Sequence, residues 1–161
     1  MKLRLKIGAA VIAALCAGAF LTGRIPNTIP YWERQAKVEV AEMMIDPSSP
    51  TFLNVRSIMQ GSTVLGVCGE VNAKNRMGAY SGFTQFYMDL TLKEVNVDPQ
   101  EPDALAEFNR QARNCAEMRA SEYASPSTVQ MACSSADKAL AAKVRQEMFD
   151  QANQNLCQAA H

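Results

Sequence analysis

The chain has 161 residues, with 16 basic side chains, 16 acidic side chains and a single histidine. This length predicts one domain, or one domain with an appendage, and the balanced charge gives no basic surface for a nucleic-acid partner. The only histidine is the last residue, His161. Because a terminal side chain is rarely held in place, the sequence disfavours serine–histidine and cysteine–histidine catalysis and metal sites built on several histidines.

Residues 1–22 have the pattern of an export signal. Lys2, Arg4 and Lys6 precede a stretch over 7–22 that has no charged residue, and this order is typical of a secretory signal peptide. As a helix the stretch would reach about 24 Å, which is short for a hydrocarbon core of about 30 Å. A cleaved signal peptide is therefore favoured over an uncleaved signal anchor.

Both interpretations of this segment place the rest of the chain outside the inner membrane, because a basic flank stays cytoplasmic. The protein is then exported and periplasmic, or else anchored in the inner membrane through 7–22 with its domain in the periplasm. A lipoprotein signal at Cys16 is less favoured, because Leu15 occupies the position where such signals have a small residue.

Four cysteines follow the export segment: Cys68, Cys115, Cys133 and Cys157. An even number in an exported domain indicates disulfides. Zinc sites use ligand pairs two to four residues apart, whereas these gaps are 47, 18 and 24 residues, so no metal site is expected.

The spacing of these cysteines favours one pairing. Cys115 and Cys133 lie nine residues on either side of Ala124, the expected turn of a helical hairpin, so antiparallel packing would bring them together. Elimination then leaves Cys68 with Cys157. Pairing of Cys68 with Cys115 or Cys133 stays open, because sequence does not fix connectivity.

The elements expected after the export segment form an α+β domain over 31–161. Residues 23–30 contain two prolines and read as a linker. An amphipathic helix is expected over 31–46, because apolar residues recur at helical spacing until the Asp-Pro pair at 46–47.

Three runs of strand character follow within 51–92, at 51–59, 63–72 and 83–92, and predict a three-stranded antiparallel meander. Apolar stripes over 102–158 predict a C-terminal helical hairpin, interrupted near Ser125. We expect the hairpin to cover one face of the sheet and the two disulfides to staple the fold.

A polar cluster near the end of the second run is the candidate binding site. Glu70, Asn72 and Lys74 are spaced by two, so an extended chain would project them from one face. The complete candidate patch consists of Arg56, Glu70, Asn72, Lys74, Asn75 and Tyr80. A solvated strand face is the plain alternative, since alternating polar residues are usual on half-buried strands.

The same region resembles a small family of exported bacterial proteins that has no assigned activity. The resemblance is carried by Asp46-Pro47-Ser48-Ser49, Phe52, Asn54-Val55-Arg56, the run from Val67 to Asn75, Gly78, Tyr80, Gly82-Phe83 and Phe86. It covers about residues 36 to 90 and leaves out the helical hairpin. The resemblance implies a compact exported domain and a motif that has a function, but it implies no catalysed reaction.

A catalytic role has little support in the sequence. Glu70 has no acidic partner nearer than Asp89 on the following strand, and Cys68 has no adjacent general base. We therefore expect a non-enzymatic periplasmic protein without cofactor that binds a protein or envelope component through the patch. The alternatives are a membrane-tethered subunit of an envelope assembly and, third, a small hydrolase using Glu70.

Overall fold

The computed structural model describes residues 17–18, 21, 23 and 25–158. Most of the predicted export segment 1–22 and the terminal His161 lie outside these residues. The contacts divide the chain into two compact units: the sheet unit, Met1–Val97 with Asn155–His161, and the hairpin unit, Asp98–Gln154. The single domain expected over 31–161 stays a prediction. No helix within the described part of the chain is long and apolar enough to cross a membrane.

The first helix of the sheet unit is α2 (Ile29–Met43). It begins two residues before the expected start, because Pro30 stands in the first turn, where a missing N–H is tolerated. It ends at Met43, before the predicted end at residue 46. Its buried side chains, Ala36 and Val40, belong to the core.

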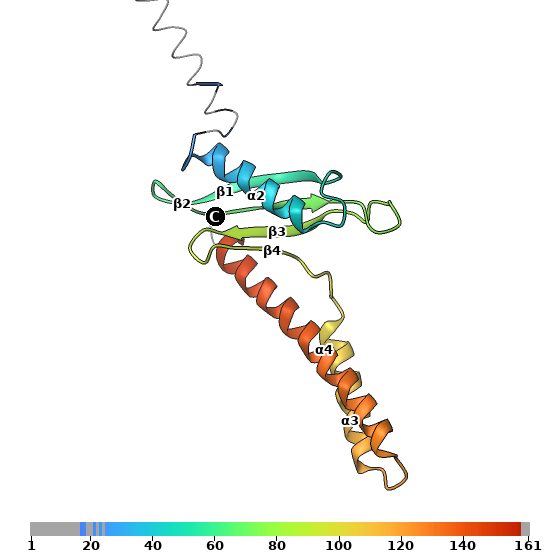
Figure 1. Cartoon of the computed structure of the whole chain (residues 1–161). Helices are drawn as coiled ribbons and strands as arrows, with labels where there is room; N and C mark the ends of the chain where they lie inside the picture. Colours follow the sequence, from blue (N-terminus) through green and yellow to red (C-terminus); the bar gives the residue numbers. More distant parts are fainter. Residues whose placement is uncertain (1–16, 19–20, 22, 24, 159–161) are drawn as a thin grey trace, which may run out of the picture. The chain divides into compact units, whose positions relative to one another are not determined.

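The sheet has four antiparallel strands in the order β1-β2-β3-β4 (Figure 1). They are β1 (Thr51–Gln60), β2 (Thr63–Asn72), β3 (Thr84–Asp89) and β4 (Glu94–Val97). The meander is confirmed, but the count of three strands is wrong. The third strand stops at Asp89, not at residue 92, because the Asp89 carboxylate accepts the N–H groups of Thr91 at 2.7 Å and Leu92 at 3.0 Å. This turn sends the chain back into β4.

One face of the sheet packs against α2 and forms the core. The buried cluster consists of Ala36, Val40, Val67, Val71, Phe86 and Met88. Phe86 is fully buried and meets Phe52 edge to face, with ring centroids 5.9 Å apart. α2 therefore covers this face of the sheet, and the cover of a sheet face by the C-terminal hairpin stays a prediction.

The opposite face of the sheet holds the end of the chain. The π-helical turn η1 (Gln154–Gln158) is joined to β2 by the Cys68–Cys157 disulfide. Leu156 approaches Gly66 so closely that a Cβ there would lie 2.9 Å from the leucine side chain. Gly66 is thus the position where another segment approaches the backbone of β2.

The hairpin unit contains α3 (Ala104–Ala120) and α4 (Pro126–Asn153) (Figure 1). Ser125 caps α4, since its Oγ accepts the N–H of Thr128 at 3.2 Å, and Pro126 occupies the first turn. The Cys115–Cys133 disulfide joins the two helices. The structure therefore contains the expected hairpin in outline, with both favoured disulfides. Its α-helices end at Asn153, and η1 continues the chain.

Candidate functional site

The six residues of the predicted patch lie on different elements of the sheet unit. Arg56 belongs to β1, Glu70 and Asn72 to β2, and the remaining three to the segment between β2 and β3. We call residues 73–83 the β2–β3 loop (Figure 1). The hydrogen bonds of the six residues decide which of them are available to a partner.

The side chain of Arg56 is hydrogen-bonded to η1. Its partner on β2 is Cys68, and its Nη2 donates to the carbonyl of Cys157 at 2.9 Å. The guanidinium therefore helps the neighbouring disulfide to hold η1 against the sheet. Arg56 is exposed, and the residue that it faces on β2, Cys68, lies six residues before Lys74 in the chain.

Glu70 is held by β1. The Nδ2 of Asn54 donates to Glu70 Oε1 at 3.2 Å. Asn54 stands in a β-bulge with a positive φ of 52°, a conformation that asparagine tolerates better than most residues. The bulge thus aims the Asn54 amide at the Glu70 carboxylate. As the spacing predicted, Glu70 and Asn72 share the sheet face that carries Cys68.

A turn before β1 organises the β2–β3 loop. Ser49 is buried, and its Oγ accepts the N–H of Lys74 at 3.0 Å and donates to the carbonyl of Asp46 at 2.9 Å. Its carbonyl accepts the Tyr80 hydroxyl at 3.1 Å. Ser49 therefore anchors both sides of the loop. This role was not predicted from the sequence, where its only signal is the place of Ser49 in the motif at 46–49.

Asp46 stabilises the same turn. Its Oδ1 accepts the Ser48 hydroxyl at 2.6 Å and the Ser48 N–H at 3.1 Å. These bonds to the charged carboxylate, aided by the nearby Lys74 ammonium, hold the pKa of Asp46 below its usual range. The turn is therefore best formed when Asp46 is ionised.

The two asparagines of the patch close the loop. Asn75 Oδ1 accepts the N–H groups of Met77 at 2.9 Å and Ala79 at 3.2 Å, and the Asn75 N–H donates to the Ala79 carbonyl at 2.9 Å. Asn72 Oδ1 accepts the N–H of Gly82 at 3.2 Å. Gly78 takes a positive φ of 76°, which glycine adopts without strain. The amides thus serve mainly as a framework.

The side chains that the loop presents to solvent are mostly apolar. Met77 is 84% exposed, Tyr80 49% and Phe83 47%, and Arg76 beside Met77 is also exposed. Lys74 lies over the Tyr80 ring, with Nζ 5.8 Å from its centroid. We call Arg76, Met77, Tyr80 and Phe83 the loop surface. Of these, only Tyr80 belongs to the patch predicted from the sequence.

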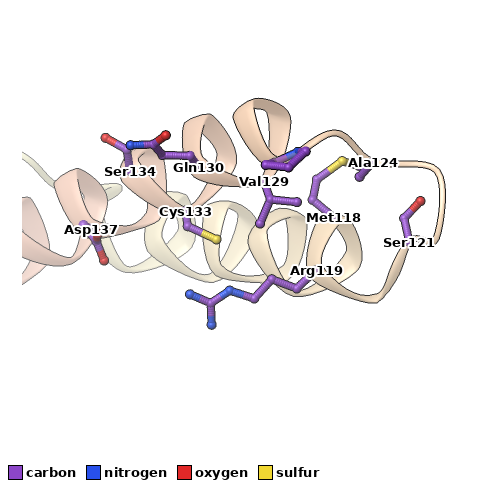
Figure 2. A pocket seen from close by; sticks show the side chains of 10 residues that line it. Met118, Arg119, Ser121, Ala124, Val129, Gln130, Cys133, Ser134 and Asp137 are labelled. Atoms are coloured by element: carbon purple, nitrogen blue, oxygen red, sulfur yellow. The ribbon is translucent and has the colours of Figure 1, made fainter.

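The hairpin unit contains a separate open groove near its turn (Figure 2). Its volume is about 680 Å³, and its lining includes the apolar side chains of Met118 and Val129 together with Arg119 and Asp137. Cys133, which also lines it, is tied to Cys115. The groove could accept an apolar side chain, but no charged lining residue is deeply buried.

No cluster of three or more histidine, cysteine, aspartate or glutamate side chains able to hold a metal ion occurs within the described ranges. Cys68, Cys115, Cys133 and Cys157 are all in disulfides.

Comparisons with known proteins add no assignment: no family model, curated protein or solved structure matches the chain.

Proposed function

We propose that the protein is an exported, non-enzymatic binding protein that recognises a protein or envelope component through the loop surface. One observation carries this proposal. The polar groups of the β2–β3 loop are used to fix its backbone, while Met77 and Phe83 are left in solvent. The patch predicted from the sequence thus supplies the framework, and its apolar neighbours supply the contacts.

The physical argument is pre-organisation. A loop that is ordered before it meets a partner loses less conformational entropy on binding. Methionine, aromatic residues and arginine are also enriched at protein interfaces relative to the remaining surface. The loop surface contains all three kinds of residue on a segment pinned by Ser49 and Asn75.

Export is supported by the disulfides, which persist in oxidising compartments. The periplasm is the compartment that fits the signal pattern of residues 1–22. The second candidate function, a membrane-tethered accessory subunit, rests on the uncharged stretch over 7–22. Intact mass of the exported protein separates the two, since a chain starting near Phe20 is free and a full-length chain is tethered.

A hydrolase based on Glu70 has less support. Asp89 pairs with Gly66, four residues along β2 from Glu70, which is roughly 13 Å at the rise of a strand. Carboxylate pairs in glycoside hydrolases are about 5 to 9.5 Å apart. Turnover abolished by Glu70→Gln in a folded protein would be required to restore this alternative.

The test of the proposed function is site-specific photo-crosslinking in the cells that export the protein. A benzophenone side chain is placed at Met77, or at Tyr123 in the hairpin turn as an equally accessible control. We expect discrete adducts from position 77 only. The adducts should weaken when Asn75→Ala releases the loop while the probe stays in place. Equal adducts from both positions, or none from position 77, would overturn the proposal.

A further inference from the structure

We infer that the partner of the loop surface is a protein whose binding site combines an apolar pocket with carboxylates, so that Arg76 pairs with an acid beside the apolar contact of Met77. This inference rests on the proposed function and specifies its partner. It follows from the local charge, from the fixed position of Arg76 and from the small number of basic residues in the loop.

The loop is positively charged in a chain that is neutral as a whole. No acidic residue occurs from Val71 to Met88, and this stretch contains Lys74 and Arg76. The acids that flank this stretch in the sequence are Glu70, which accepts a hydrogen bond from Asn54, and Asp89, which accepts two from Thr91 and Leu92. Among the described residues, no ion pair joins either acid to Arg76.

The two basic residues of the loop are not equivalent. Lys74 is half-buried, lies over the Tyr80 ring and is near Asp46. Arg76 is exposed and makes no ion pair within the described part of the chain. Arg76 is therefore the cation that a partner can reach.

The backbone around Arg76 is fixed by its neighbours. Asn75 accepts the N–H groups of Met77 and Ala79, and the Gly78 N–H donates to the Asn75 carbonyl at 2.9 Å. Arg76 and Met77 thus leave the tip of a closed turn at adjacent positions. A guanidinium binds a carboxylate through two parallel hydrogen bonds, and such a pair is stronger when an apolar contact excludes water next to it.

An anionic membrane is the other chemistry that could attract this surface. Membrane recognition by charge uses clusters of about four to eight basic residues, whereas the loop has two, of which one is engaged. A single arginine beside methionine and aromatic side chains matches the anchors of a protein interface better. We therefore assign the surface to a protein partner.

The experiment selects peptides from a random 12-residue phage library on the oxidised full-length protein. We expect the enriched peptides to carry carboxylates next to aromatic or aliphatic residues. The Kd of an enriched peptide should rise at least tenfold with Arg76→Glu and several-fold with Arg76→Lys or Met77→Ala. Lys138→Glu reverses the charge of an exposed residue in the hairpin unit and is the matched control. It should leave the Kd unchanged.

The other outcomes separate a failure of the acidic partner from a failure of the binding function. Peptides that need Met77 and Phe83 but ignore Arg76 would overturn the acidic partner and leave the binding function standing. Peptides that ignore every loop substitution, or no enrichment at all, would overturn both. In a last measurement, the protein is sedimented with vesicles of phosphatidylcholine and phosphatidylglycerol at 7:3. If the protein binds these vesicles, loses this binding in Arg76→Glu and binds no peptide, the result would overturn the protein partner in favour of a membrane.

Discussion

In the sheet unit, side chains from α2 and all four strands meet in one core, whereas in the hairpin unit most buried positions are small. The core cluster includes Phe86 and Met88 with Trp32 and Phe52 packed against it. The buried residues of α3 and α4 are instead mostly small, namely Ala104, Cys115, Ala132, Ala136 and Ala139, with Phe149 and Asn153 near the end of α4. Larger apolar side chains such as Leu140 and Met148 are exposed on α4.

The comparison indicates that the two units are stabilised by different interactions. Burial of apolar area contributes about 25 cal/mol per Å², so alanine seams contribute little compared with phenylalanine and methionine. A pair of helices with such a seam needs other constraints, and in the hairpin unit the Cys115–Cys133 disulfide joins α3 to α4 covalently, beside the contact of Lys143 with the Phe108 ring. The sheet unit can therefore present a rigid loop, while the hairpin unit depends more on its Cys115–Cys133 disulfide.

The largest effect is expected from the core of the sheet unit. Phe86→Ala should lower the free energy of unfolding by about 3 to 5 kcal/mol, because it leaves a cavity in a fully buried site. The fluorescence of Trp32, the single tryptophan, reports this unit during urea unfolding. Phe83→Ala is the matched control and should change the value by only about 0.5 kcal/mol, since Phe83 is half exposed.

The next effect concerns the hairpin unit. Replacing both Cys115 and Cys133 with serine removes a bridge of sequence separation 18, for which the chain-entropy model gives about 3 kcal/mol. Helical circular dichroism should be lost at lower urea, while the Trp32 transition stays nearly in place. An equal shift of both signals would contradict the separate stabilisation of the two units.

A smaller effect is expected at the anchor of the loop. Ser49→Ala removes the Oγ that accepts the Lys74 N–H and keeps the backbone carbonyl that accepts the Tyr80 hydroxyl. The amide left unsatisfied costs about 1 to 3 kcal/mol. Hydrogen exchange should accelerate across residues 73–83 and remain slow in α2. Ser81→Ala, at an exposed loop position, is the control. Unchanged exchange after Ser49→Ala would show that the loop is fixed by other contacts.

The smallest effect is the pH response of the turn at Asp46. Because the folded pKa is lowered, the stabilisation is complete above the unfolded pKa and is lost as the pH falls through the folded value. The Ser48 amide resonance should therefore move only below about pH 4. Asp46→Asn keeps an oxygen acceptor without titrating, so its Ser48 resonance should stay constant. Movement in that variant would assign the change to another group.

Features that depend on the number of residues of one type, or on their spacing along the chain, could be predicted from the sequence. The even number of cysteines predicted disulfides, and the equal distances of Cys115 and Cys133 from Ala124 favoured the pairing that is observed, while other pairings of Cys68 stayed open. Strand β4 escaped prediction because four residues are too few to show an alternating pattern. Asp89, which is a frequent turn former, was the available signal.

The candidate site could be predicted only in part, because its geometry depends on contacts between distant segments. Spacing by two placed Glu70 and Asn72 on one face. No local pattern shows that Ser49 receives the N–H of Lys74, 25 residues away, and the hydroxyl of Tyr80, 31 residues away. Through these contacts the polar residues fix the backbone of the loop, while Met77 stays exposed. The polar residues, which were expected to contact a partner, therefore support the loop, and Met77 is available for contact.

The Cys68–Cys157 bridge also bears on how the protein is made. It spans 89 residues and encloses the other pair, so Cys68 skips the next two cysteines in the chain. An exported chain that emerges from its N-terminus presents Cys115 to Cys68 long before Cys157 arrives. Oxidation in order of arrival would join the wrong pair, which only thiol exchange can undo. We therefore expect the yield of native protein in the cell to depend on a disulfide isomerase.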